Sequence, residues 1–325
     1  MTSISTIHNS LAPQLESLNR QIEQALTSPN ELMNMVIRSY LEKKGKQIRP
    51  IIVLLTAQLL GGINNKVISG AVAVELLHNA SLIHDDVVDD TTMRRGAQTI
   101  NGAYDNHMAV LIGDFFLSNA LLQSVATGDI RVVESISNLG KLLSVGELDE
   151  ISNSKANTFD EDKYFEIIYR KTASLFVSCV EVGAYGAGLS EGDDLDALRE
   201  FARLLGLCFQ IKDDIFDYFS DEAIGKPTGN DLREGKITLP LLHVLNRADL
   251  PRQPEMARLA CSESHTPAEI ATLIAYAVDN GGIDYANACM ARLRAQAARL
   301  LDRFPDSQAR RNLLAIFDFI IDRKN

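Results

Sequence analysis

Two clusters of aspartates with the same spacing are the residues of this chain whose types and positions best suit chemistry. In chain order the clusters comprise Asp85, Asp86, Asp89, Asp213, Asp214 and Asp217. Helical residues three or four positions apart share a face, with Cβ atoms about 5–6 Å apart, so the first and last members of each cluster point the same way. Carboxylates around one cavity repel each other unless cations hold them, and an oxygen-rich site suits Mg²⁺, which bridges carboxylates to phosphates. The pattern predicts a metal-dependent enzyme that acts on a diphosphate.

Each cluster ends a polar stripe along a helix that is otherwise apolar. The first stripe recurs every third or fourth residue and consists of Glu75, His78, Ser81, Asp85 and Asp89. The second consists of Arg203, Gly206, Gln210, Asp213, Asp214 and Asp217. A buried helix with one polar stripe lines a polar cavity rather than solvent. A solvated acidic patch is the simpler explanation of one such cluster, but two copies on inward helix faces favour a functional site.

Basic residues lie close to both clusters in the sequence. They are Lys46, Arg49, Arg94, Arg95, Lys171, Lys226 and Lys236. Arginine binds phosphate through two parallel hydrogen bonds, and lysine acts as a point charge. Any one of them is most simply an ordinary surface cation. Their repeated proximity to the aspartates predicts a charge-balanced site for an anionic substrate.

Composition narrows the class of protein. The chain has 325 residues, of which 46% are apolar, and its net charge of −11 argues against a nucleic-acid surface, which would be basic. Its four cysteines form no CxxC pair, which is typical of buried, reduced thiols. We find no secretory signal at the N-terminus and no apolar run near 18 residues. We therefore expect a soluble cytoplasmic protein without a membrane span.

Proline placement and apolar periodicity predict an all-α fold. No proline lies between Pro50 and Pro227, which permits long helices, and apolar stripes recur with the helical period. Ser28 and Pro29 are expected to begin a helix that ends near Gly45, and Asp306 to cap the last helix. Other helices are expected near 51–60, 67–89, 105–125, 130–150, 161–186, 192–219, 236–246 and 267–280. The chain is expected to form one helical bundle with a central substrate cavity, a single domain over 1–325, with a motif-bearing core at about 40–245 and a C-terminal helical portion at about 246–325.

The motifs around these residues resemble those of the trans-polyprenyl diphosphate synthases, the head-to-tail isoprenyl chain-elongation enzymes. The matching segments, in order, are GKQIRP, LLHNASLIHDDVVDDTTMRRG, GDFF, RKTASLF, FQIKDDIFDY and GKPTGNDLREGKITLP. Within the family the chain is most similar to bacterial long-chain synthases of the octaprenyl type, which supply quinone tails. The resemblance implies an isoprenoid-synthase fold, a homodimer and Mg²⁺, with three ions per active site.

The resemblance also implies a role for each site residue. The diphosphate of isopentenyl diphosphate would be held by Lys46, Arg49, His78 and Arg95. Mg²⁺ would be bound by Asp85, Asp89 and Asp213, supported by Asp86, Asp214 and Asp217. The allylic diphosphate would contact Arg94, Lys171, Gln210, Lys226 and Lys236, with Thr172 orienting the reacting face. The family usually has a basic residue at Gln47, so one cation is missing near the isopentenyl site.

The expected reaction follows from electrostatics. Metal ions and cations stabilise the diphosphate as it leaves the allylic substrate. The double bond of a positioned isopentenyl diphosphate then attacks the allylic carbocation. By analogy with the family, the departing diphosphate takes the proton that is lost. His84 is interpreted as a packing residue rather than a base.

The side chains one turn before Asp85 predict the product length. They are Leu77, Ala80 and Ser81, and none is aromatic. Family members that stop early usually carry Phe or Tyr at the fourth or fifth residue before the first cluster. The open wall therefore predicts a product longer than C20, in the range C30–C40, with deeper residues near Leu121 and Leu122 setting the exact length.

Four alternatives remain open. A shorter-chain synthase making farnesyl or geranylgeranyl diphosphate would carry the same motifs. A metal phosphohydrolase using His84 and Asp85 would need further histidine ligands and would leave Asp213 and the basic residues unused. A class I terpene cyclase would carry an Asn/Ser/Glu pattern at its second metal site, which is missing here. A non-catalytic synthase subunit would usually lack one aspartate cluster, and both are intact.

Overall fold

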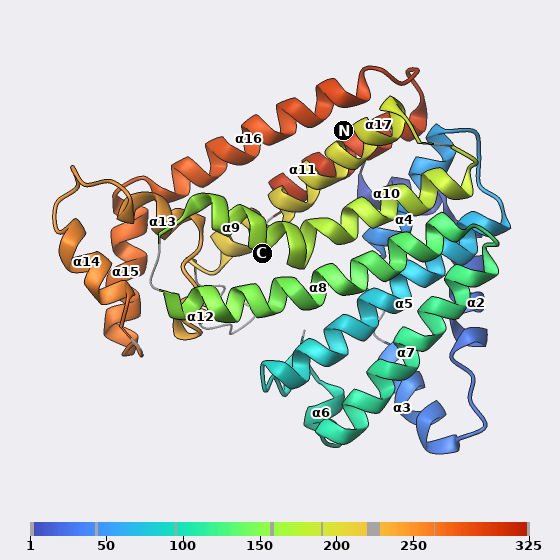
Figure 1. Ribbon diagram of the computed structural model, residues 1–325, viewed down its shortest axis with the longest axis horizontal. Helices are drawn as coiled ribbons and strands as arrows, with labels where there is room; N and C mark the ends of the chain where they lie inside the picture. The colour runs from blue at the N-terminus through green and yellow to red at the C-terminus, as the bar shows by residue number, and fades with distance from the viewer. Residues whose placement is uncertain are drawn as a thin grey trace. The chain divides into compact units, whose positions relative to one another are not determined.

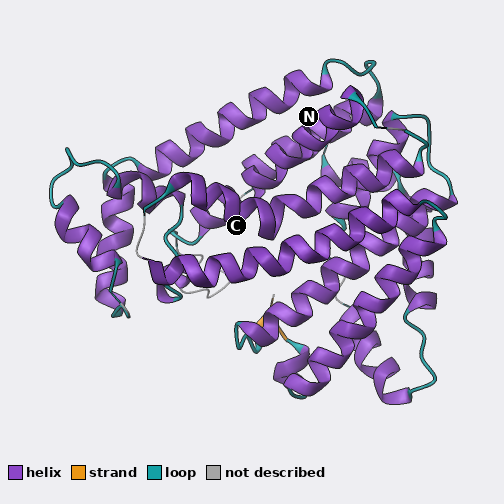
Figure 2. Cartoon of the chain, in the orientation of Figure 1, coloured by secondary structure: helices purple, strands orange, loops and turns teal. Residues whose placement is uncertain are grey.

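The computed structural model describes residues 3–42, 45–94, 96–156, 159–189, 191–219, 228–262 and 264–323. In these ranges the regular secondary structure is helical apart from one pair of two-residue strands, so the predicted all-α fold is confirmed (Figure 1, Figure 2). The first helices are α1 (Ile4–Ser10), α2 (Ala12–Ala25), α3 (Glu31–Leu41), α4 (Ile48–Leu59), α5 (Asn65–Val88), α6 (Ile100–Ala103) and α7 (Asn106–Ala126). Strands β1 (Met93–Arg94) and β2 (Ala97–Gln98) form an antiparallel pair between α5 and α6.

The later elements are also helical. They are α8 (Ile130–Ala156), α9 (Glu161–Ile168), the π-helical segment η1 (Tyr169–Ala173), α10 (Ser174–Gly186), α11 (Asp193–Phe216), α12 (Asn230–Arg233), α13 (Leu239–Leu245), α14 (Gln253–Ala260), α15 (Pro267–Asp279), α16 (Gly282–Leu301) and α17 (Gln308–Asp322). Contacts divide the chain into two compact units. Unit 1 comprises Met1–Lys141, Leu175–Arg199 and Asp302–Ala315, and unit 2 comprises Leu142–Ser174, Glu200–Leu301 and Ile316–Asn325. The single domain expected over 1–325 stays a prediction.

Helix α5 is the core of unit 1 and ends at the first aspartate cluster. It begins at the cap Asn64, whose side chain accepts a hydrogen bond from the Val67 N–H, which satisfies a donor of the first turn. Its small and branched apolar side chains are buried along most of its length, and it packs chiefly against α7 and α4. The close contact with α7 depends on Gly113, since a Cβ there would lie 2.2 Å from His84 Nε2. His84 lies against α7, with its Nε2 3.4 Å from the Val110 carbonyl oxygen and from Asp114 Oδ1, and its role as a packing residue stays a prediction.

Helices α5 and α7 are each long and apolar enough to cross a membrane by length and composition alone. Their most apolar windows are 67% and 39% buried within the protein, and the two helices pack against each other. A core helix of a soluble protein meets the same criteria, so the observation is weak evidence for a membrane span. The absence of such a span remains a prediction.

In unit 2 helices α13, α14 and α15 pack around one apolar cluster. Leu241, Val244, Leu273 and Ala277 are fully buried in it, and Tyr218 joins it from the end of α11. The helix expected near 267–280 is present as α15, and it begins with a capping box, in which the Thr266 side chain and the Glu269 side chain each accept from the other's backbone N–H.

Two predicted helix starts are wrong. Asn30, not Ser28, caps α3, since its side chain accepts from the Met33 N–H at 3.1 Å, and the helix ends at Leu41 rather than near Gly45. Ser307, not Asp306, lies at the start of α17, where its hydroxyl accepts from the Arg310 N–H at 3.2 Å. In both cases a neighbouring polar residue has the better geometry for the same capping bond.

Candidate active site

The first aspartate cluster lies at the C-terminal end of α5, where its members have different environments. Asp86 is buried, with 5% of its surface exposed, and its Oδ1 accepts from Arg94 Nε at 2.7 Å. Burial raises the pKa of Asp86, and the Arg94 charge opposes that shift. Asp85 is half-buried and Asp89 is exposed, one turn apart on the same helix. Asp86 thus anchors the segment after α5, while Asp85 and Asp89 lie toward the surface.

The predicted diphosphate contacts of unit 1 lie on several elements. Arg94, in β1, holds Asp86, so its contact with a substrate stays a prediction. His78 is half-buried on α5, and Lys46 is exposed in the segment before α4. The Arg49 guanidinium lies over the Phe176 ring, 5.8 Å from its centroid. Arg95 is outside the described residues.

Gln47, where the family usually has a basic residue, begins α4 in the left-handed conformation, with φ of 50°. Its Nε2 donates to Asn19 Oδ1 at 2.8 Å, which ties this loop to α2. A non-glycine residue with a positive φ is uncommon, and the surrounding structure holds Gln47 in this conformation. Gln47 therefore shapes the segment that carries Lys46 and Arg49.

The second cluster lies at the end of α11 in unit 2, and Asp214 is its most buried member. Only 4% of its surface is exposed. Tyr164 Oη donates to its Oδ2 at 2.6 Å, and Gln210 Nε2 donates to its Oδ1 at 2.8 Å. Burial raises the pKa of Asp214 to about 7, against the effect of these two hydrogen bonds. Asp214 therefore acts as the centre of a buried polar network.

The other two members of this cluster have partners of their own. Asp217 accepts from the backbone N–H groups of Asn230 and Asp231, both at 3.0 Å, and so caps α12. Asp213 Oδ1 accepts from Arg323 Nη2 at 2.6 Å. The Arg323 guanidinium also lies 4.3 Å from the centroid of the Phe209 ring. Arg323, near the end of the chain, is a site residue that sequence reasoning missed.

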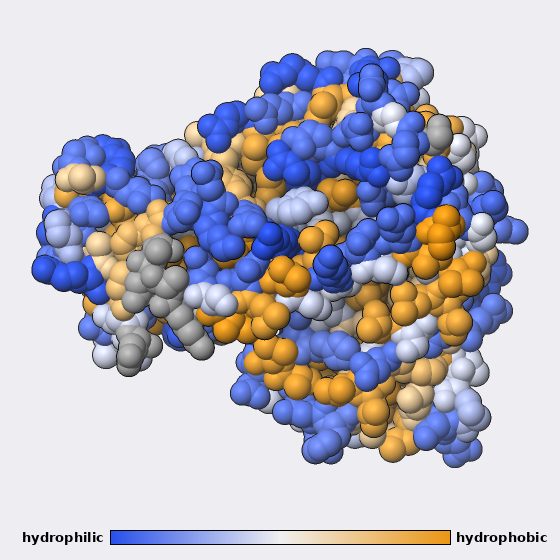
Figure 3. Space-filling view, viewed as in Figure 1, coloured by the Kyte–Doolittle hydropathy of each residue, from blue (hydrophilic) through white to orange (hydrophobic). Residues whose placement is uncertain are grey.

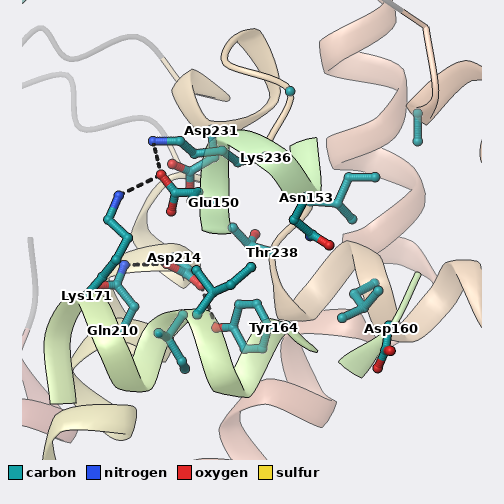
Figure 4. A pocket seen from close by; sticks show the side chains of 16 residues that line it. Glu150, Asn153, Asp160, Tyr164, Lys171, Gln210, Asp214, Asp231, Lys236 and Thr238 are labelled. Atoms are coloured by element: carbon teal, nitrogen blue, oxygen red, sulfur yellow. Dashed lines mark hydrogen bonds and ion pairs between the residues drawn. The ribbon is translucent and has the colours of Figure 1, made fainter. Parts of the chain in front are cut away.

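A cavity of about 170 Å³ in unit 2 brings several predicted residues together (Figure 4). Its lining includes Lys171, Gln210, Asp214 and Lys236. Thr172 donates to Gln210 Oε1 at 2.7 Å, which joins the π-helical segment to α11. Single-turn π-helical insertions occur frequently at functional sites, and this one carries Lys171 and Thr172. Lys226 is outside the described residues.

Both lysines of the cavity bind Glu150, on α8 (Figure 4). Lys171 Nζ lies 2.6 Å, and Lys236 Nζ 2.8 Å, from the same oxygen, Glu150 Oε2. Burial acts to raise the pKa of Glu150, but the two ammonium charges outweigh it and the pKa is lowered. Lys171 also binds Glu147 at 2.8 Å. Sequence reasoning missed both glutamates, although their spacing of three places them on one helix face.

Gly146 allows α8 to approach the π-helical segment. A Cβ at this position would lie 2.9 Å from the Lys171 backbone N and 2.8 Å from Arg170 Cβ. We expect Gly146→Ala to lower the free energy of unfolding by about 1–3 kcal/mol, the usual cost of overpacking. Urea unfolding followed by circular dichroism measures this change.

Gly140, on the same helix, supplies the matched control. A Cβ there would meet only Leu77 Cδ1, at 4.0 Å. Since alanine favours helix over glycine by up to about 1 kcal/mol, Gly140→Ala should be neutral or stabilising. Equal effects of the two substitutions would contradict the close approach at Gly146.

The residues predicted to bind metal fit Mg²⁺ through their chemistry rather than through a closed cage. Across the part of the chain that the structure describes, no three His, Cys, Asp or Glu side chains are gathered closely enough to hold an ion. Mg²⁺ is usually held by one or two carboxylates together with waters and substrate phosphates. Asp85, Asp89 and Asp213 offer such oxygens without histidine or thiolate competitors.

The Polyprenyl synthetase family model matches residues 30–277. The chain belongs to this family. It is 32% identical to an octaprenyl diphosphate synthase of Haemophilus influenzae, over 99% of this chain and 98% of that protein. A polyprenyl synthase from Caulobacter crescentus, solved with calcium and isoprenyl diphosphate, is 31% identical with a TM-score of 0.91, covering 100% of this chain and 99% of that one. A geranylgeranyl pyrophosphate synthase from Bacteroides thetaiotaomicron is 36% identical with a TM-score of 0.85, covering 99% of this chain and 100% of that one.

These likenesses confirm two predictions made from the sequence. The resemblance to the polyprenyl diphosphate synthases is confirmed, and so is a transferase that makes prenyl diphosphates of the long-chain kind. The roles of individual residues stay predictions. In unit 2 the cavity brings Lys171, Gln210, Asp214 and Lys236 together, and Thr172 binds Gln210. Asp217 binds the backbone of Asn230 and of Asp231, which also lines the cavity, whereas Asp213 binds Arg323.

The predicted wall of the product channel is only partly as expected. Ala80 and Leu77 are buried on α5, with 2% and 3% of their surfaces exposed, and Ser81 is half-buried. Leu121 and Leu122 are 39% and 63% exposed on α7, so their placement deep in a pocket is wrong. The helical period turns them away from the buried face of α7, which carries Phe116 and Ala120.

Proposed function

We propose that this member of the Polyprenyl synthetase family uses Mg²⁺ to condense isopentenyl diphosphate with an allylic diphosphate, such as farnesyl diphosphate, into an all-trans product of C30–C40. The observation that carries the proposal is the cavity in unit 2, where Lys171 and Lys236 converge beside Asp214. Two ammonium groups within reach of one oxygen atom are spaced to bind neighbouring oxygens of a diphosphate. The octaprenyl relative supports the long-chain product. By the resemblance given above, that product would supply quinone side chains.

The chain's residues would divide the work between the two substrates. Bound Mg²⁺, held by Asp85, Asp89 and Asp213, would neutralise charge on the leaving diphosphate. Lys171 and Lys236 would hold that diphosphate as negative charge develops on it. The isopentenyl diphosphate would be placed for attack by the residues predicted for it, Lys46, Arg49, His78 and Arg95.

Gln210 and Thr172 would act beside the reacting carbon. The Thr172 hydroxyl donates to Gln210 Oε1, while Gln210 Nε2 donates to Asp214, so both side chains are held in one orientation. Oxygen atoms fixed next to an allylic carbocation stabilise its charge without reorganising. The mechanism needs no side-chain base, since the departing diphosphate takes the proton.

Incubation with labelled isopentenyl diphosphate, farnesyl diphosphate and Mg²⁺ tests the proposal. We expect incorporation of label into a prenyl chain of C30–C40, and loss of incorporation when EDTA removes the metal. A C20 product would favour the second candidate, a geranylgeranyl diphosphate synthase, to which the Bacteroides structure points. Release of inorganic phosphate from nucleotides without condensation would contradict both.

We further infer a cytoplasmic homodimer with α7 in its interface. Exposed apolar side chains follow one another along this helix, and Figure 3 shows hydrophobic side chains gathered over this part of the surface. They are Val110, Leu111, Leu121, Leu122 and Val125. Exposed apolar patches of this kind mark interaction sites.

Leu122, which is 63% exposed, tests the dimer. We expect Leu122→Glu to convert a dimer to a monomer, because a charge would be buried without a partner in the interface. Size-exclusion chromatography with light scattering measures the mass. A wild-type monomer, or a variant that stays dimeric, would contradict the assignment of α7.

A further inference from the structure

The two lysines of the unit 2 cavity are surrounded by carboxylates. Glu150 binds both, Glu147 binds Lys171 at 2.8 Å, and Glu234 binds Lys236 at 2.7 Å. Asp214 and Asp231 also line the cavity, and burial raises the pKa of each. The three contacting carboxylates therefore more than balance the two ammonium charges.

This balance has a consequence for substrate binding, which rests on the function proposed above. A diphosphate can bind the lysines only if they exchange a carboxylate for a phosphate oxygen. Glu150 is the carboxylate that competes most directly with the diphosphate for the lysines, because both ammonium groups bind one of its oxygens. Its side chain is only 20% exposed, so its charge is poorly screened by water.

We propose that Glu150 is a built-in competitor for the substrate diphosphate, which holds Lys171 and Lys236 until a metal-bound diphosphate displaces it. A bare diphosphate is repelled by the Glu150 carboxylate and gains little from lysines that are already paired. A diphosphate whose charge is partly neutralised by Mg²⁺ meets less repulsion and exchanges more easily. Glu150 thus makes diphosphate binding conditional on the metal, and it recaptures the lysines when the product diphosphate leaves.

A purely structural role for Glu150 makes the opposite prediction. In that case the carboxylate would only tie α8 to the π-helical segment and to the loop before α13. Its removal would then loosen the lysines and weaken the binding of any anion. The sign of the change in affinity therefore separates competition from scaffolding.

The test is the affinity of Glu150→Gln for inorganic pyrophosphate, measured by titration calorimetry with EDTA and again with Mg²⁺. Gln keeps the size of the side chain and removes its charge. Since a hydrogen bond to a charged group is worth roughly tenfold in a binding constant, we expect binding without metal to tighten about tenfold. The ratio of the pyrophosphate binding constant with Mg²⁺ to that with EDTA should therefore be smaller in the variant than in the wild type.

Glu234→Gln is the matched control. Glu234 binds Lys236 alone and is 50% exposed, so we expect less than about a threefold change. Glu147→Gln repeats the test in a second variant, with a smaller gain than Glu150→Gln, should the latter fail to fold. Circular dichroism checks the fold of each.

Unchanged or weaker binding of metal-free pyrophosphate by a folded Glu150→Gln overturns the proposal, as does an equal gain in Glu234→Gln. Failure of the proposed function gives a different result. The wild-type protein would then bind no pyrophosphate even with Mg²⁺ and would transfer no prenyl group, which overturns both.

Discussion

Replacing Asp85 or Asp213 by alanine is expected to lower the rate of prenyl transfer by roughly a thousandfold. Loss of one preorganised electrostatic contact to a developing anion has an effect of this size. Both residues are proposed metal ligands, and neither is needed for the hydrophobic core, since each is partly exposed. The loss should therefore appear in kcat with the fold intact. Labelled isopentenyl diphosphate measures the rate, and circular dichroism checks the fold.

Arg323 should stay in place when Asp213 is replaced by alanine. Arg323 now binds Asp213, and its guanidinium also donates to the Phe209 carbonyl oxygen at 2.9 Å. Removal of Asp213 leaves this second bond in place, so Arg323 should keep its position. Asp279→Ala, at an exposed position near the end of α15, is the control and should keep near-normal rates. Near-normal turnover in either the Asp85 or the Asp213 variant would remove the metal assignment.

Replacing Ala80 by phenylalanine is expected to shorten the main product from C30–C40 to C20 or less. Ala80 is 2% exposed and lies about one turn before Asp85 on α5. We propose that the growing chain runs along α5, and a phenyl ring at this closely packed position would block its path. Chromatography of the dephosphorylated products measures the chain length.

Ala80→Ser changes the volume little and serves as the control, with the product length of the wild type. The shortened product should form at a rate near that of the wild type, because the substitution leaves the aspartates and lysines in place. An Ala80→Phe variant that still makes the wild-type product would show that the chain does not run along α5.

Residue types and spacing were sufficient to predict the local features of the site. The helix that carries Asp85 and Asp89 was predicted because its stripe of polar residues follows the helical period. The helix expected near 267–280 was predicted from the same period, and α15 spans Pro267–Asp279. Such features are local, so they can be recognised in one sequence.

Contacts between distant segments could not be predicted in the same way. Nothing near Arg323 indicates that it binds Asp213, and nothing near Glu150 indicates that it joins Lys171 to Lys236. The capping of α12 by Asp217 also depends on how the chain returns after α11. These partners are selected by tertiary packing, which local patterns do not encode.

Asp85 and Asp213 are proposed to serve one diphosphate through shared metal ions. A crystal structure with Mn²⁺ in place of Mg²⁺ and an unreactive allylic diphosphate analogue tests it most directly, since anomalous scattering locates the ions. We predict ions coordinated by Asp85, Asp89 and Asp213 that all contact the same diphosphate, with Lys171 and Lys236 on its oxygens. Ions bound to only one aspartate cluster, or a diphosphate bound away from both, would contradict the account.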